Sequence, residues 1–217
     1  QMYPASTAKI ITALVAYDLY KIDSTIKVDS VLEDGQIMGL VRGEEITIEN
    51  LLYGTLVHSG NDAAYALAQP IGLLAFVEKM NEKARKLHMN DTYFANPAGL
   101  HDPVQVSSAF DLALAGRALL NNVYLSKIVS TKEIEISDTQ YRIFHKLINV
   151  NKLLGDIPGV GGLKTGYTIE SGENLVSLYR TPDGHEFIIV VLNSLDRFED
   201  TKTIVNWLNA NVVFTNN

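Results

Sequence analysis

Hydrophobic residues recur every three or four positions over much of the first half of the chain, a spacing typical of amphipathic helices. In residues 4–20 the apolar side chains of Ile10, Ile11 and Leu14 repeat in this way, and Pro4 marks the helix start. The same spacing predicts helices over 51–57 behind the capping signal Thr47-Ile-Glu-Asn50, after Ser59-Gly-Asn-Asp62, over 73–89, over 108–121 and over about 199–210.

Alternation of apolar and polar residues replaces this spacing after about Ser130, as in Glu133-Ile-Glu-Ile136, and predicts strands. Further strand candidates cover 163–168, 174–180 and 186–193, and short β-prone pieces occur earlier at 25–28 and 37–41. The last two candidates are separated by Thr181-Pro-Asp-Gly184. Because Pro presets φ and Gly tolerates a positive φ, this sequence predicts a tight turn and an antiparallel hairpin.

The order of these elements predicts one domain of mixed α/β (α+β) class. A length of 217 residues suits a single domain, and no repeat, low-complexity tract or linker is visible. We expect an antiparallel sheet flanked by helices from about 1–20 and 156–217, with a mainly helical lobe inserted over about 25–155. Hydrophobic residues make up 47% of the chain, which suffices for a core and excludes a disordered chain.

Charge and cysteine content exclude several classes of function. Eighteen Lys and Arg against 25 Asp and Glu give a net charge of −7, so we expect no nucleic-acid partner. The absence of cysteine excludes disulfides, zinc–thiolate sites and thiol catalysis. Uncharged apolar runs such as 188–192 have the length of a strand, so we expect no membrane span, and the first residues lack a signal-peptide pattern.

Ser6 and Lys9 stand three residues apart at the predicted start of the first helix, so their side chains are expected on one face within contact distance. A serine hydroxyl becomes a nucleophile when a base takes its proton, and a lysine can be that base if burial or a second cation lowers its pKa. The free N–H groups of a helix start also favour a developing oxyanion. Taken alone, the pair is more typical of an N-cap with a surface lysine.

Two further motifs carry candidate chemistry. Ser59-Gly-Asn61 lies at a corner between two predicted helices, where side chains converge on a cleft, although Ser and Asn also cap helices. Lys164-Thr-Gly166, followed by Tyr167, lies on a predicted strand. Alternation places its Lys and Gly on one face and its Thr on the other, and the glycine leaves room for a substrate backbone.

The order S-x-x-K, S-x-N and K-T-G, each on its expected element, is far more specific than any one motif. On these motifs the sequence resembles the serine D-alanyl-D-alanine carboxypeptidases, low-molecular-weight penicillin-binding proteins of the clan that includes serine β-lactamases. The resemblance runs over nearly the whole chain, through PASTAK, HSGNDAA, NPAGLHD, SSAFDLALAGRALL, Asn149-Val-Asn151 and GLKTGYT. It implies the DD-peptidase/β-lactamase fold, with no cofactor and no metal.

The resemblance implies a catalytic set of Ser6, Lys9, Ser59 and Asn61. Ser6 is expected to attack the penultimate D-Ala carbonyl of a peptidoglycan stem peptide, releasing the terminal D-Ala, after which water regenerates Ser6. Lys9 is the expected base, kept neutral by the charge of Lys164. Ser59 is expected to carry the proton to the leaving amine, and Asn61 to hold Lys9 and the substrate amide. β-Lactam antibiotics are expected to acylate Ser6 as well.

The same resemblance implies a substrate-binding set of Lys164, Thr165, Gly166, Tyr167 and Arg197. Lys164 and Thr165 are expected to meet the terminal carboxylate; Arg197 is a second candidate for that role and equally a candidate surface residue. The N–H groups of Ser6 and Tyr167 are expected to form the oxyanion hole. The substrate is expected to pair with residues 164–168 as an added strand.

Other functions share parts of this motif set. A class A β-lactamase needs a Glu after the S-x-N motif to activate the deacylating water, and residues 93–102 contain none. A D,D-endopeptidase for cross-linked peptidoglycan and an inactive penicillin-binding fragment both remain compatible with the motifs. His58 adjoins Ser59, but no G-x-S-x-G elbow supports a triad, and His101-Asp102 lacks a third ligand for a metal.

The sequence departs from the family pattern before Ser6, where the family has a strand hairpin and a helix. Without those N-terminal strands, residues 186–193 are expected to form an unpaired apolar edge, which promotes self-association. We therefore expect a fragment, a truncated product or a chain whose missing strands come from another chain. The resemblance places the protein outside the cytoplasm, in the bacterial cell envelope, and neither a signal nor an anchor is visible in the sequence.

Overall fold

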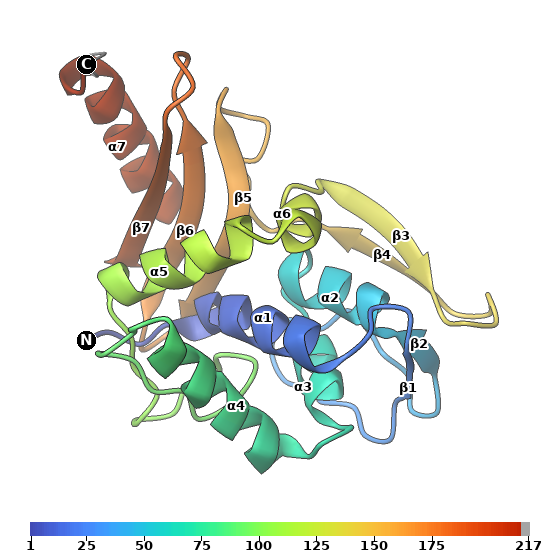
Figure 1. The fold of residues 1–217 in the computed structure, drawn as a ribbon. Coiled ribbons are helices and arrows are strands. Elements are labelled where there is room, and N and C mark those ends of the chain that lie inside the picture. Colours follow the sequence, from blue (N-terminus) through green and yellow to red (C-terminus); the bar gives the residue numbers. More distant parts are fainter. Residues whose placement is uncertain (214–217) are drawn as a thin grey trace.

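Three antiparallel strands build the main sheet, in the order β5-β6-β7 (Figure 1). The computed structural model describes residues 1–213. Strand β5 covers Val160–Thr168, β6 covers Gly172–Arg180 and β7 covers Glu186–Ser194. The hairpin predicted from the Pro-Asp-Gly sequence is confirmed, because Arg180 pairs with Glu186 and Gly184 adopts a φ of 94°.

Helices cover both faces of this sheet (Figure 1). Successive side chains of β7 point to opposite faces, so each helix packs against every second residue of that strand. Helix α5 (Ala109–Leu120) belongs to the core cluster against which Ile188 and Val190 pack. Helix α7 (Arg197–Asn211) shares a second cluster with Ile189 and Val191. The mixed α/β class with an antiparallel sheet, predicted from the sequence, is therefore confirmed.

The first helix lies between the sheet and the other helices. A 3₁₀ helix, η1 (Ala5–Ala8), leads directly into α1 (Lys9–Leu19). Every residue of α1 as far as Ala16 is buried, because α2, α4 and α5 all pack against it. A helix that is buried on all sides is a core helix, so the start of α1 is packed against its neighbours on every face.

The remaining helices and two small sheets form the helical part of the molecule. They are α2 (Ile48–Leu56), α3 (Asn61–Ala68), α4 (Leu73–Lys86), α6 (Val123–Val129), the pair β1 (Thr25–Lys27) and β2 (Glu45–Thr47), and the pair β3 (Glu133–Ser137) and β4 (Phe144–Ile148). The predicted cap of α2 is confirmed, since the Asn50 N–H donates to the Thr47 hydroxyl at 3.2 Å. Among the helices of residues 1–213, none combines the length and the apolar character needed to span a membrane.

The sequence prediction was wrong at 37–41, which is not a strand. The backbone N–H groups of Met38, Gly39 and Leu40 donate instead to the carboxylate of Asp62. Residues of high β propensity form a strand only where a partner strand is available, and here a side chain takes the hydrogen bonds. Helix α6 and strands β2 and β4 were not predicted.

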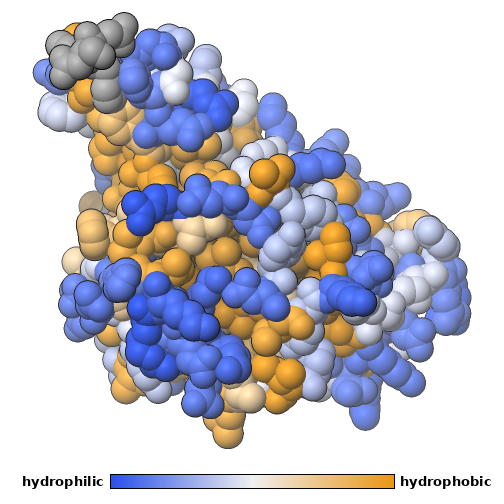
Figure 2. Space-filling view, in the orientation of Figure 1, coloured by the Kyte–Doolittle hydropathy of each residue, from blue (hydrophilic) through white to orange (hydrophobic). Residues whose placement is uncertain are grey.

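Strand β7 is an edge of the sheet, and no strand within residues 1–213 pairs with its outer side. Figure 2 shows apolar side chains gathered over β7 and the neighbouring faces of α5 and α7. Ile188, Val190 and Leu192 are only partly buried there. An apolar strand edge of this kind is a surface on which another strand can pair.

Candidate active site

Ser6 and Lys9 meet at the junction of η1 and α1. In a 3₁₀ helix the side chains at positions i and i+3 lie above one another, so this short helix brings the two together. The Lys9 Nζ lies 2.9 Å from the Ser6 Oγ. The expected contact between the two side chains is confirmed, and Lys9 is fully buried rather than a surface residue.

The Lys9 amine has two other close neighbours, and both are pure acceptors. Its Nζ lies 2.7 Å from the Asn61 Oδ1 and 2.6 Å from the Ala98 carbonyl oxygen. A neutral amine has two N–H donors and one lone pair, whereas a hydroxyl can donate or accept. If the two carbonyl oxygens take both N–H bonds, the lone pair of Lys9 faces the proton of the Ser6 hydroxyl.

The surroundings of Lys9 favour that neutral form. Burial of the side chain, and secondarily the charge of Lys164, lower the pKa of Lys9 well below its ordinary value, against the opposing charge of Asp62. Burial, together with the charge of Arg197, lowers the pKa of Lys164 to about 7. Burial is therefore the larger cause of the lowered pKa of Lys9, and the charge of Lys164, which the sequence predicted as the cause, is the second.

A cleft of about 310 Å³ opens above this buried group. Its lining comes from distant parts of the chain: Ser6, Gly35, Gln36, Ser59, Val150, Thr165, Gly166, Tyr167 and Arg197. Lys9, Asn61 and Lys164 lie beneath this surface, at 0%, 4% and 2% exposure. All nine residues predicted from the sequence therefore either line the cleft or lie directly under its lining.

Two non-glycine residues beside the cleft have a left-handed backbone. Ala5, which precedes the nucleophile candidate, has a φ of 47°, and Ser59 has a φ of 64°. Such conformations are uncommon outside glycine and cluster at functional sites, where the surrounding structure holds them. The Ser59 side chain is thereby presented at the corner between α2 and α3.

Strand β5 forms one wall of the cleft with its free edge. The Thr168 N–H donates to the Ser171 hydroxyl in the β5–β6 turn, so alternation directs the Tyr167 N–H to the opposite edge, toward the cleft. A Cβ on Gly166 would lie 3.0 Å from the Ser6 nitrogen and 3.1 Å from the Pro4 oxygen. The glycine thus admits the chain's own nucleophile segment, where the sequence had suggested room for a substrate backbone.

Arg197 closes the far end of this wall, at the first residue of α7. Its Nη1 donates to the Gly166 carbonyl at 2.8 Å, and its backbone N–H donates to the Glu173 carboxylate at 3.0 Å. The guanidinium also lies 4.9 Å from the centre of the Phe198 ring. Arg197 is therefore a fixed cation in the cleft wall and not a freely solvated surface residue.

Sequence reasoning missed three groups that hold the site together. The Ala98 carbonyl binds Lys9, and a backbone carbonyl leaves no trace in the residue type. Gly99 has a φ of 78°, and a Cβ there would lie 1.9 Å from the Ala5 oxygen. The fully buried Asn174 donates to the Tyr3 and Pro4 carbonyls at 2.9 and 3.1 Å.

His58 and His101, for which the sequence predicted neither a catalytic nor a metal-binding role, do not contact Ser6 or Lys9 in the hydrogen bonds described above. The His58 Nε2 lies 2.9 Å from the Gln36 side-chain nitrogen. His101 stacks edge-on against Tyr3 and lies 4.0 Å from the Glu170 carboxylate. Across residues 1–213, no three His, Cys, Asp or Glu side chains come together in an arrangement that could hold a metal ion.

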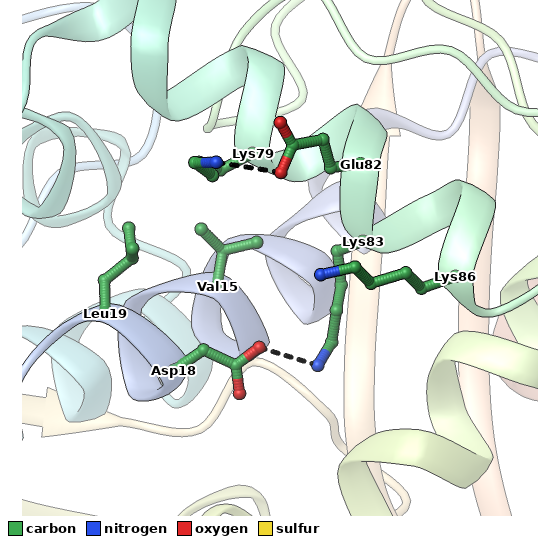
Figure 3. A pocket seen from close by; sticks show the side chains of 7 residues that line it. All are labelled: Val15, Asp18, Leu19, Lys79, Glu82, Lys83 and Lys86. Carbon is green, nitrogen blue, oxygen red and sulfur yellow. Dashed lines mark hydrogen bonds and ion pairs between the residues drawn. The ribbon is translucent and has the colours of Figure 1, made fainter.

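A second hollow, of about 210 Å³, lies between α1 and α4 (Figure 3). Lys83 contacts Asp18 at 2.8 Å across it, and Lys79 contacts Glu82 at 2.9 Å along α4. Asp18 lies about two and a half turns beyond Lys9 along α1. This hollow holds solvated ion pairs and no nucleophile beside a base, so it is not a candidate active site.

A buried lysine amine that contacts a serine hydroxyl, beneath the free edge of an antiparallel sheet, is the arrangement typical of Ser-x-x-Lys enzymes. The chain belongs to the peptidase S11 family, D-alanyl-D-alanine carboxypeptidase, which matches residues 1–196. The family named from the sequence motifs is therefore confirmed.

Relatives and solved structures agree with this assignment. The D-alanyl-D-alanine carboxypeptidase DacF of Bacillus subtilis is 38% identical over 180 residues, which are 79% of this chain and 46% of DacF. A D-alanyl-D-alanine endopeptidase of Haemophilus influenzae is 34% identical over 79% of this chain and 60% of its own length. The chain thus spans about half the length of these two relatives. An evolved penicillin-binding protein homologue from Mycobacterium tuberculosis superimposes with a TM-score of 0.90 at 29% identity, covering 100% of this chain and 85% of that one.

Proposed function

We propose that this chain is the catalytic unit of a serine D,D-carboxypeptidase, which removes the terminal D-Ala from peptidoglycan stem peptides through an acyl-enzyme on Ser6. The observation that carries the proposal is the contact of Lys9 with Ser6 at 2.9 Å, with both other neighbours of the amine being carbonyl oxygens. Cell-wall peptides lie outside the cytoplasm, so the proposed place of action is the bacterial cell envelope.

Acylation begins when the Ser6 hydroxyl gives its proton to the neutral Lys9 amine. The Ser6 oxygen attacks the carbonyl of the penultimate D-Ala, and the negative oxygen of the tetrahedral intermediate accepts hydrogen bonds from the Ser6 and Tyr167 N–H groups. The C–N bond then breaks, and Ser59 gives its proton to the leaving amine of the terminal D-Ala while it takes the proton held by Lys9, so that Lys9 is neutral again. The products of this step are free D-Ala and an ester on Ser6.

Deacylation repeats the same proton path with water in place of the amine. Water gives a proton to Lys9 and attacks the ester carbonyl, and Lys9 returns that proton to the Ser6 oxygen as the ester bond breaks. The shortened peptide departs with a new carboxylate. A Lys9 held by Asn61 and Ala98 stays in place through both halves of the reaction.

Substrate binding uses the free edge of β5 and the cations behind it. The peptide pairs with β5 as an additional antiparallel strand, with its terminal carboxylate facing Thr165, Lys164 and Arg197. Arginine and lysine near one another supply the positive potential that a carboxylate requires. This arrangement selects a free C-terminus next to the scissile bond, as a carboxypeptidase requires.

A β-lactam offers the same carbonyl in a strained amide, so it is expected to acylate Ser6 and to leave slowly. The test is intact-mass spectrometry of the protein with benzylpenicillin, compared with Ser6→Ala and with Ser130→Ala as a matched surface serine. We expect one stoichiometric adduct in wild type and Ser130→Ala and none in Ser6→Ala. An unlabelled wild type, or a labelled Ser6→Ala, would refute the proposal.

The peptide substrate requires a separate comparison. A free D-Ala-D-Ala pentapeptide and a cross-linked dimer are incubated with the protein, and released D-Ala and monomer are quantified by mass spectrometry. Release of D-Ala from the pentapeptide alone supports a carboxypeptidase, and cleavage of the dimer supports an endopeptidase such as the one among its relatives. Rapid turnover of a chromogenic cephalosporin would identify a β-lactamase instead.

A further inference from the structure

Residues 31–42 border the cleft without forming a helix or a strand. Gly35 and Gln36 line the cleft opposite β5. The Gln36 carbonyl accepts the Asn61 backbone N–H at 2.7 Å, and the Asp34 carbonyl accepts the Asn61 side-chain N–H at 2.8 Å. This irregular segment therefore contacts a residue of the proposed catalytic set at two points.

The carboxylate of Asp62 fixes the position of the segment. Its Oδ1 accepts the Met38 N–H at 2.9 Å, and its Oδ2 accepts the N–H groups of Gly39 and Leu40 at 2.9 and 3.0 Å. The Oδ1 also accepts the Ala63 N–H at 2.9 Å. Asp62 is 2% exposed, at the N-terminal end of α3, where a helix favours a negative charge.

The position of the segment decides how the Asn61 amide is oriented. With its NH₂ group held by the Asp34 carbonyl, the amide presents its oxygen to Lys9. A Cβ on Gly35 would lie 2.7 Å from the Asn61 Nδ2, so the segment passes close to the amide and only a glycine fits between them. A flipped amide would instead direct N–H groups at the Lys9 amine, which is itself a donor.

Asp62 also acts on Lys9 through its charge. Two charged side chains bear on the Lys9 amine, Lys164 from β5 and Asp62 from α3, and Asp62 raises the pKa of Lys9 against the larger lowering effects of burial and Lys164. The groups that touch the amine directly, from Ser6, Asn61 and Ala98, are neutral. A change in Asp62 therefore alters both the geometry and the protonation of the Ser6–Lys9 pair.

We propose that Asp62 is a positioning residue of the acylation reaction: by tying residues 38–40 to the start of α3, it holds the 34–36 segment that orients the Asn61 amide toward Lys9. The inference rests on the proposed function, since it concerns acylation of Ser6. It extends the active site to a residue that touches neither the substrate nor Ser6.

The test compares Asp62→Asn with Asp138→Asn. Asp138 is a matched control, because it is also buried and accepts two backbone N–H groups, of Arg142 and Ile143, at the β3–β4 hairpin. Asp62→Asn places an NH₂ group against backbone N–H donors, so the segment should be released. We expect the second-order rate of penicillin acylation to fall about 10- to 100-fold in Asp62→Asn, and to stay within about twofold of wild type in Asp138→Asn.

The pH profile of acylation distinguishes positioning from loss of folding. Without the Asp62 charge the pKa of Lys9 falls further, so Lys9 is neutral at lower pH and the acid limb of the profile should move to lower pH. A merely structural role would reduce the amount of active protein and leave that limb in place. Asp62→Asn with a wild-type rate, or with less active protein whose rate constant and acid limb both equal those of wild type, would overturn the proposal.

A second pair of variants keeps the test decisive if Asp62→Asn does not fold. Gly35→Ala, on an exposed residue, pushes the segment away from Asn61 and leaves every charge in place. Gly43→Ala imposes a similar backbone strain, at a φ of 86°, with no atom within 4 Å of the added Cβ. We expect acylation to be slow in Gly35→Ala and near the wild-type rate in Gly43→Ala, with the acid limb of the pH profile unmoved in both. Equal acylation rates in the two variants would contradict the proposal. If wild type is not acylated at all, the proposed function itself has failed.

Discussion

The side-chain amide of Asn174, in the middle strand of the sheet, donates to the backbone carbonyl of Pro4 at 3.1 Å. Its oxygen in turn accepts the Asn193 N–H from β7 at 2.8 Å. One buried side chain thus ties the segment that precedes Ser6 to two strands. The nucleophile candidate is positioned by the sheet as much as by its own helix.

Replacing Asn174 by Ala should therefore slow acylation as well as lower stability. The loss of buried hydrogen bonds should cost about 1–3 kcal/mol of unfolding free energy, and release of the nucleophile segment should reduce the acylation rate by about 100-fold. Asn81→Ala is the control, because the buried Asn81 likewise bridges the Phe94 backbone by two hydrogen bonds of 2.8 Å. Urea denaturation and penicillin acylation kinetics measure the two effects. A similar rate loss in both variants would contradict the prediction.

Gly166→Ala should impair the site through contact with the chain itself. The new Cβ would lie 3.0 Å from the Ser6 nitrogen, which is proposed to bind the oxyanion. We expect acylation to fall by about 100-fold, because a shift of about 1 Å is enough for such a loss. Gly161→Ala, in the same strand, meets only the Leu178 side chain at 3.2 Å and should retain a rate near that of wild type. Stopped-flow measurement with a fluorescent penicillin gives both rates.

Lys164→Gln should move the acid limb of the acylation profile to higher pH. The charge of Lys164 lowers the pKa of Lys9 by destabilising its protonated form, so removing that charge raises the pKa and a higher pH is needed to free the base. The rate plateau should also fall, because Lys164 is proposed to bind the substrate carboxylate. Rates measured across the pH range test the direction of the shift, and a limb that moves to lower pH would exclude this role for Lys164.

Stability should depend on pH through the buried pair of His145 and Glu44, whose atoms lie 2.7 Å apart. Burial lowers the pKa of His145, but the hydrogen bond and charge of Glu44 outweigh it and raise the pKa above its ordinary 6.5. A raised pKa contributes stability that is complete below 6.5 and is lost as pH rises through the higher value in the folded state, by about 1.4 kcal/mol for each unit of the shift. Thermal unfolding should show this loss in wild type and not in His145→Gln. If His145→Gln kept the pH dependence of the wild type, the loss of stability would have to come from groups other than the pair of His145 and Glu44.

The sequence predicted the elements whose pattern is local. The continuous apolar run that contains Ile188 and Ile189 marks a strand with two covered faces, and the Pro-Asp-Gly turn sets its hairpin. Strand β4 was missed because its exposed positions include Phe144 and Ile148, which hide the alternation, and its pairing with β3 is a tertiary property. Residues 37–41 were misassigned for the opposite reason, since the side chain that binds them is Asp62, some twenty residues later.

The candidate site was predicted where side-chain chemistry carries it and missed where the backbone does. Ser6, Lys9 and Asn61 are identifiable because their residue types are required. The Ala98 carbonyl, the third partner of the Lys9 amine, could have been supplied by any residue type. Asn174 acts on Pro4 across 170 positions of sequence, and no spacing rule connects residues so far apart.

The lining of the cleft runs from Ser6 near the beginning of the chain to Arg197 near its end, by way of Gly35, Ser59 and Val150. These residues meet only when the two ends and the middle of the polypeptide have all docked, so the contacts that build the cleft join residues far apart in the sequence. A half-folded chain has no such cleft. Only folded molecules would then react with a β-lactam. The fraction of molecules that a β-lactam labels along a denaturant series would therefore measure the fraction of folded protein.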